Sequence, residues 1–66
     1  MSQLKKYRIM NNYTQKEMAE KLKISIPAYW NYENGKRIMP ADVLIRFLEL
    51  RGTKEDLKLA KILKEF

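Results

Sequence analysis

Two helix-start signals lie close together in this chain, and they constrain its fold more than any other feature. Thr14 followed by Glu17 is a capping box, in which the hydroxyl accepts from the Glu17 amide and the carboxylate reaches back to the Thr14 amide. Ser25 followed by Pro27 is a further helix start, because a proline in the first turn removes an amide that has no intrahelical partner. The sequence therefore predicts two short helices, over about residues 15–22 and 26–34, joined by only about three residues.

Similar signals elsewhere predict three more helices. Ser2 can cap a first helix that runs to about Met10. Pro40 opens a fourth helix, which Gly52 ends, and Thr53 caps a fifth. The fold class that we expect is all-α, a compact five-helix bundle with short connections.

Apolar side chains recur at helical spacing and identify the expected core. The inward residues are predicted to be Leu4, Tyr7, one of Ile9 and Met10, Met18, Ala19, Leu22, Val43, Leu44, Phe47, Leu48, Leu57, Ala60, Leu63 and Phe66. The second and third helices share so short a turn that they must cross steeply and need a small side chain where they meet. Ala19 supplies it, and this is the geometry of a helix-turn-helix.

Composition limits the possible functions. A chain of 66 residues forms one domain, residues 1–66, and with no cysteine or histidine it lacks disulfides, thiolate metal sites and the commonest general base. We therefore expect no enzyme, no metal, no cofactor and no small-molecule ligand. No apolar run approaches the roughly 18 residues of a membrane span, so we expect a cytoplasmic protein without a membrane partner.

The positive charge is concentrated in the first half of the chain. Residues 1–37 carry eight Lys or Arg against three acidic residues, whereas residues 38–66 carry six against five. This asymmetry indicates one side that faces an anion and another side with a different role. A solvated lysine-rich surface is the alternative interpretation.

These residues resemble a known family. The segment "YTQKEMAEKLKIS", the segment "YENGKR" followed by Pro40, and the offsets of Leu4 and Arg8 are similar to the phage-repressor and Cro type of helix-turn-helix, also called the xenobiotic-response-element type. The resemblance covers about residues 4–50. It implies a lambda-repressor-like DNA-binding domain, usually dimeric, whose third helix enters the major groove of double-stranded DNA.

The helical wheel of the third helix separates its aromatic residues. Tyr29 and Tyr32 point toward the second helix and are predicted to be core. The opposite face is predicted to meet the groove, and it carries Ile26, Pro27, Trp30, Asn31 and Asn34.

Four of these outward residues are candidates for base contact. Asn31 can bind adenine N6 and N7, with an ordinary solvated residue as the alternative. Ile26 and Pro27 cannot hydrogen-bond a base through their side chains, so they either contact thymine methyl groups or only pack at the helix start. Trp30 can stack on sugar-phosphate, fill the groove or dock on a second protein, because a large exposed apolar group usually belongs to a site.

Phosphate contacts follow from the resemblance. It implies that Gln15, at the start of the second helix, lies over a phosphate, and that a cationic loop binds the next strand. The predicted phosphate contacts are Gln15, Lys16, Asn34, Lys36 and Arg37, with Lys5 or Lys6 as further possibilities.

Two other positions are predicted to shape this surface. Arg8 is expected to pair with Glu33, or with Glu17, and so to orient the third helix rather than touch DNA. Lys23 lies in the turn where the family usually has glycine, so we predict a left-handed or distorted backbone there. The left-handed conformation would cost a lysine roughly 1 kcal/mol.

The leading interpretation is a sequence-specific DNA-binding transcriptional regulator, a repressor rather than an activator, on a two-fold operator. Apolar residues outside the expected core form a candidate homodimer interface, namely Ile38, Met39, Leu59, Ile62 and Phe66. The alternative is a protein–protein interaction module, antitoxin-like or antirepressor-like, that uses Trp30 and Ile26 to dock on a protein partner.

Overall fold

The computed structural model describes residues 2–66, which fold into five helices and contain no strand. The helices are α1 (Gln3–Met10), α2 (Gln15–Leu22), α3 (Ile26–Glu33), α4 (Ala41–Arg51) and α5 (Lys54–Lys64). The predicted all-α, five-helix architecture is confirmed. None of these helices has the length and apolar character needed to span a bilayer.

Hydroxyl side chains begin four of the helices, as the sequence predicted. Each accepts a hydrogen bond from the amide three residues later, and the pairs are Ser2 with Lys5, Thr14 with Glu17, Ser25 with Ala28, and Thr53 with Asp56. The Thr14 amide also donates to Glu17 Oε1 at 2.9 Å, which completes the capping box. Each such cap stabilises its helix by about 1 kcal/mol.

Left-handed residues end or follow four of the helices, and Asn12, with φ 57°, is the one that follows α1. Lys23 has φ 59° and ψ 44° at the end of α2, Gly35 has φ 72° just after α3, and Gly52 has φ 65° at the end of α4. The predicted left-handed conformation of Lys23 is confirmed. These sharp stops keep the connections short and turn the chain back onto itself.

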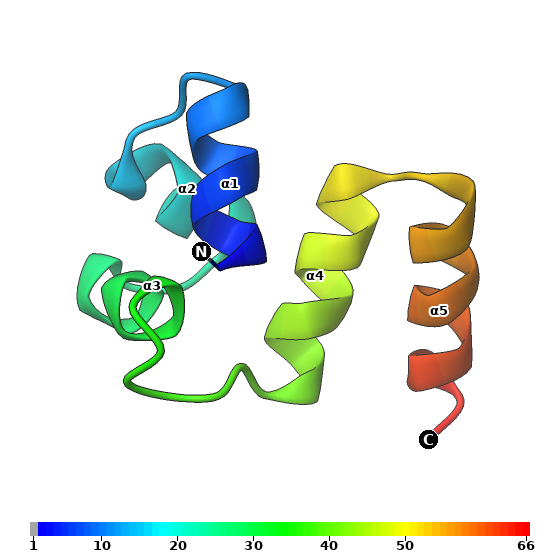
Figure 1. Ribbon diagram of the computed structural model, residues 1–66. Helices are drawn as coiled ribbons and strands as arrows, with labels where there is room; N and C mark the ends of the chain where they lie inside the picture. The colour runs from blue at the N-terminus through cyan, green and yellow to red at the C-terminus, as the bar shows by residue number, and fades with distance from the viewer. Residues whose placement is uncertain (1) are drawn as a thin grey trace.

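The core lies between the first three helices and α4 (Figure 1). It contains one cluster of buried side chains from α1 to α4, namely Leu4, Met18, Ala19, Leu22, Tyr29, Val43 and Phe47. Tyr29 is the largest of the fully buried side chains. Leu4, Met18, Ala19, Leu22, Val43 and Phe47 are therefore confirmed as core residues.

The helix α5 packs on the other side of α4 (Figure 1), with Ala60 buried and Leu63 half-buried. The prediction that Leu57 and Phe66 face inward is wrong, because Leu57 is 49% exposed and Phe66 is fully exposed. A helix that packs against one neighbour buries only a narrow stripe, and Asp56 takes part of that stripe through its ion pair with Arg51.

The end of α1 requires a second correction. Neither Ile9 nor Met10 faces inward, since both side chains are exposed. The chain turns away immediately after Met10, at Asn11 and Asn12. The last two residues of α1 therefore lie outside the core, to which this helix contributes Leu4 and the half-buried Tyr7.

Candidate nucleic-acid interface

The two sides of α3 have different environments. Tyr29 is fully buried and Tyr32 packs partly buried against the core, whereas Trp30 is 44% exposed and Ile26 is 45% exposed. The predicted division of the aromatic residues, tyrosines inward and tryptophan outward, is confirmed. Pro27 is exposed beside Ile26, and Asn31 is half-buried.

The turn between α2 and α3 sets the angle at which α3 leaves the core. Ala19 is buried, and its carbonyl accepts a hydrogen bond from the Ile24 amide at 3.0 Å. Such a wrap-around bond needs the left-handed residue that precedes it, which is Lys23. A side chain larger than alanine would separate two helices that meet directly after this turn.

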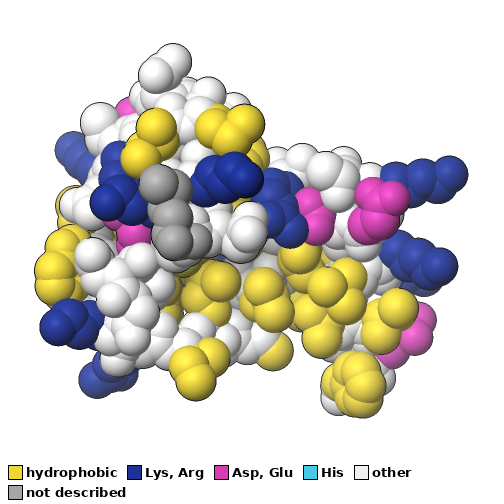
Figure 2. Space-filling model, viewed as in Figure 1, with side chains coloured by type: hydrophobic (Ala, Val, Ile, Leu, Met, Phe, Trp, Pro, Cys, Tyr) yellow, Lys and Arg dark blue, Asp and Glu magenta, His cyan; other side chains and the backbone are white. Residues whose placement is uncertain are grey.

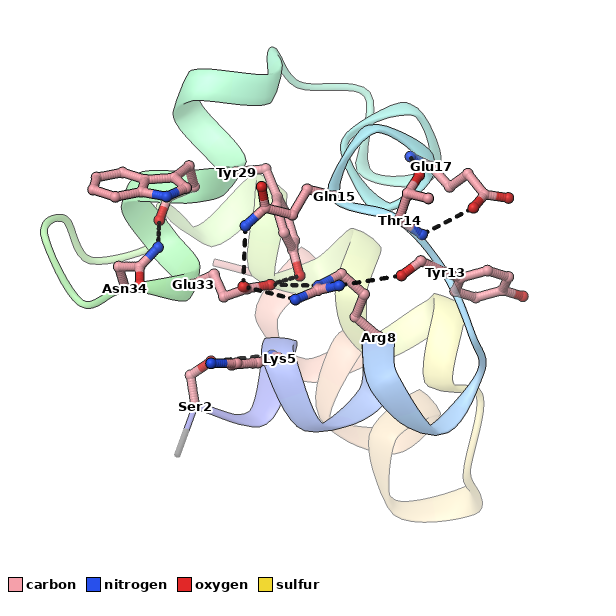
Figure 3. A network of polar contacts seen from close by, with 11 residues as sticks. Ser2, Lys5, Arg8, Tyr13, Thr14, Gln15, Glu17, Tyr29, Glu33 and Asn34 are labelled. Carbon is pink, nitrogen blue, oxygen red and sulfur yellow. Dashed lines mark hydrogen bonds and ion pairs between the residues drawn. The ribbon is translucent and has the colours of Figure 1, made fainter.

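A buried carboxylate ties α3 to both of the preceding helices (Figure 3). The Glu33 side chain is 3% exposed and accepts from Arg8 Nε on α1 at 2.8 Å. It also accepts from the Tyr29 hydroxyl at 2.6 Å and from Gln15 Nε2 on α2 at 3.3 Å. The predicted Arg8–Glu33 pair is therefore confirmed, and the hydrogen bonds from Tyr29 and Gln15 were missed.

These contacts decide the ionisation of Glu33. Burial raises the pKa of the Glu33 carboxyl, but hydrogen bonds from Arg8, Tyr29 and Gln15 outweigh burial and hold the pKa below its ordinary value. Burial, with the hydrogen bond to Glu33, raises the pKa of the Tyr29 hydroxyl, so Tyr29 stays protonated and continues to donate. The network is thus a fixed carboxylate surrounded by donors.

Gln15 uses only part of its hydrogen-bonding capacity in this network. A side-chain amide nitrogen carries two hydrogens, and one of them is directed to Glu33. Within residues 2–66, the other hydrogen and the backbone amides of Gln15 and Lys16 have no hydrogen-bond partner, whereas the Glu17 amide is bonded to the Thr14 hydroxyl. Gln15 therefore keeps donors for an anion while its side chain is held in place.

The loop after α3 is fixed to the same helix. The carbonyl of Asn31 accepts from the amide of Lys36 at 2.8 Å and from the amide of Arg37 at 3.3 Å. Gly35 has the positive φ that such a loop requires, and nothing lies within 4 Å of the position its Cβ would take. The backbone of two cationic residues is thus fixed just beyond the end of α3.

The predicted phosphate-binding residues other than Gln15 are exposed, namely Lys16, Asn34, Lys36 and Arg37. Within residues 2–66 no acidic side chain pairs with Lys16, Lys36 or Arg37. Asn34 donates its side-chain amide to the Trp30 carbonyl at 2.9 Å (Figure 3). On the left of Figure 2, apolar side chains over α3 lie between Lys and Arg side chains.

The residues expected in a dimer interface lie in the loop before α4 and on or after α5. Ile38 is 95% exposed in the loop before α4, and Leu59, Ile62 and Phe66 are exposed on or after α5. Met39 is only partly exposed, because it packs against the core. Figure 2 shows apolar side chains gathered over α4 and α5.

The described residues offer a surface rather than a cavity. Residues 2–66 form no pocket, and they bring no three acidic side chains close enough to hold a metal ion. What this arrangement can do is present an apolar helix face with a cationic border to a large, anionic, grooved partner.

Of the two hydrogen bonds to Glu33 that the sequence analysis did not predict, one has a recognisable pattern in the sequence and the other does not. Tyr29 and Glu33 are four residues apart on one helix, a spacing that places both side chains on one side. Gln15 and Glu33 are far apart in the sequence and meet only because α2 and α3 cross. The first contact was open to sequence analysis, and the second needed the tertiary structure.

No curated protein and no solved structure matches this chain. A family model described as "Helix-turn-helix domain" matches residues 2–64, which is nearly the whole chain and includes all five helices. Together with the short turn at Lys23 and the close approach of α2 and α3 at Ala19, this match shows that the chain belongs to the helix-turn-helix domain family.

Proposed function

We propose that this chain is a cytoplasmic, sequence-specific DNA-binding transcriptional regulator that places α3 in the major groove. The observation that carries the proposal is the outward face of α3, where Trp30 and Ile26 are exposed beside a loop with two cations that no acid in residues 2–66 neutralises. A helix whose opposite side is locked into the core presents such a face rigidly, as groove reading requires.

The cations supply the register on the duplex. The backbone amides of Lys36 and Arg37 donate to the Asn31 carbonyl, which fixes this loop relative to α3. Phosphate contacts by the loop would therefore fix the position of α3 along the groove. Gln15 and Lys16 at the start of α2 would contact a phosphate on the other side. The resemblance to phage repressors favours repression over activation.

A two-fold operator needs two copies of the chain. We infer that the exposed apolar side chains of Ile38 and of α5 and its end, Leu59, Ile62 and Phe66, form the contact between copies. The two α3 helices would then lie about 34 Å apart, matched to half-sites one turn of DNA apart.

The test of DNA binding is selection of duplexes from a random pool, followed by a salt titration of the enriched sequence. We expect enrichment of a two-fold motif. A plot of log affinity against log salt concentration should have a slope of about −0.9 for each DNA phosphate that the protein neutralises. Lys36→Ala and Arg37→Ala should each reduce this slope by about 1.

The matched control is Lys58→Ala, which removes an exposed lysine on α5, outside the proposed interface with DNA. It should leave the salt slope unchanged. If no motif is enriched, and a partner protein binds with little dependence on salt, the chain is instead an interaction module that docks through Trp30 and Ile26.

A further inference from the structure

The outward face of α3 has an unusual composition for a groove-reading helix. Residues 26–33 include no Lys or Arg. The acid of this helix, Glu33, is buried in its network and unable to reach a base. Within residues 26–33, the side chains left for a partner are three apolar ones, Ile26, Pro27 and Trp30, and one amide, Asn31. The amide of Asn34, just after this helix, donates to the Trp30 carbonyl.

This set of side chains fits some base edges and not others. Guanine presents two acceptors in the major groove, which are best bound by Arg or Lys, and α3 has neither. Cytosine presents a donor that is best bound by an acid, and Glu33 is already occupied. Adenine fits an asparagine, and thymine alone carries a methyl group that an apolar side chain can cover.

The nearby cations do not change this conclusion. Lys36 and Arg37 follow the end of α3, and their amides are bound to the carbonyl of Asn31. That position lies beyond the end of α3, and the proposed interface puts these two cations against phosphates rather than bases. The charges of the interface are therefore at its border and its centre is uncharged.

We propose that each half-site is read as A·T base pairs, with Asn31 on an adenine and with Ile26, Pro27 and Trp30 against thymine methyl groups. This inference rests on the proposed function and adds the class of sequence that the chain binds. Loss of one covered methyl group should weaken binding about fourfold. Loss of the Asn31 contact should reduce discrimination at one position by about 5- to 150-fold.

The experiment removes methyl groups from the DNA and leaves the protein intact. Duplexes of the selected motif are synthesised with 2′-deoxyuridine in place of each thymine in turn, and binding is measured by fluorescence anisotropy at one salt concentration. We expect a motif rich in A·T pairs and a loss of about fourfold at each contacted thymine. At a thymine that faces Trp30, the loss should disappear in the Trp30→Ala variant.

The matched control is Leu57→Ala, which removes an apolar side chain of similar exposure from α5 and should retain the full effect of deoxyuridine. Selection of a G·C motif, or binding that is equal with and without the methyl groups, would overturn the inference while leaving DNA binding intact. Failure to enrich any duplex would overturn the proposed function itself, so the two failures are distinguishable.

Discussion

Lys23 adopts a backbone conformation that glycine reaches far more easily. Within residues 2–66, Asn12 and Lys23 are the two residues other than glycine with positive φ, at 57° and 59°. Asparagine tolerates this region because its short side chain bonds locally, whereas lysine gains no such compensation. The unfavourable conformation of Lys23 occurs in the turn between α2 and α3, which sets the position of α3.

Replacement of this lysine should therefore stabilise the fold. We expect Lys23→Gly to raise the free energy of unfolding by about 1 kcal/mol, because glycine adopts positive φ without the clash of a Cβ. Urea denaturation followed by circular dichroism measures the change. Asn12→Gly is the control and should gain less. A neutral or destabilised Lys23→Gly variant would show that the turn stores no strain.

At the scale of elements, one carboxylate determines how α3 sits on α1 and α2. Glu33 accepts hydrogen bonds from both of those helices and from Tyr29 on its own helix. A buried charge of this kind contributes little when it is paired and costs a great deal when a partner is removed. The orientation of the outward face is thus specified by a few polar contacts beneath it.

Removal of the arginine should be far more damaging than removal of the tyrosine hydroxyl. Arg8→Met leaves Glu33 buried without a cation, and we expect a loss of about 3–5 kcal/mol. Tyr29→Phe keeps the ion pair and should cost about 1.5–3 kcal/mol. Both are measured by urea denaturation.

The control for this pair is Lys6→Met, which removes an exposed cation from the same helix and should change stability by less than about 0.5 kcal/mol. A domain of this size has a total stability on the order of 3–10 kcal/mol, so Arg8→Met should lose a large fraction of it and unfold at a much lower urea concentration. An Arg8→Met variant as stable as Lys6→Met would mean that the pair does not hold α3.

At the scale of the whole molecule, the response to pH depends on carboxylates alone below neutrality. The chain has no histidine. Hydrogen bonds from Arg51 and Thr53 hold the pKa of Asp56 below its ordinary value, bonds to Thr14 do the same for Glu17, and the Glu33 network acts likewise. Each group binds a proton more weakly in the folded state than in the unfolded chain.

Stability should therefore be nearly constant from about pH 6 to 8 and should fall on acidification. The loss begins near the unfolded values of 4.5 for Glu and 3.8 for Asp and continues through the lower folded values. Urea denaturation between pH 3 and 8 measures it. Glu17→Gln keeps the capping interaction without the charge and should show a weaker dependence. Stability that rises on acidification would contradict this account.

Self-association is the second property of the whole molecule. We expect Ile62→Glu to abolish the dimer, because a charge would be buried in the proposed interface between copies. Sedimentation at increasing protein concentration, with and without the selected duplex, measures it. Leu57→Glu, on a different side of α5, is the control. A wild-type chain that stays monomeric at high micromolar concentration, even with duplex present, would count against the dimer.

The sequence by itself determined the helices, because their boundaries depend on contacts within a few residues. The capping box at Thr14, the proline at the start of α3 and the left-handed Lys23 were all predictable from such neighbours. The orientation of α3 was predictable too, since Tyr29 and Tyr32 share one side of the helical wheel and Trp30 lies on another.

The tertiary structure alone decided which side chains meet across helices. The contact of Gln15 with Glu33, and the donation from Arg46 to the Leu22 carbonyl at 3.1 Å, join residues far apart in the sequence. The exposure of Leu57 was equally unpredictable, because an apolar stripe on a helix does not indicate how many other helices pack against it. Local chemistry fixes where a helix begins and ends, whereas burial depends on the helices that surround it.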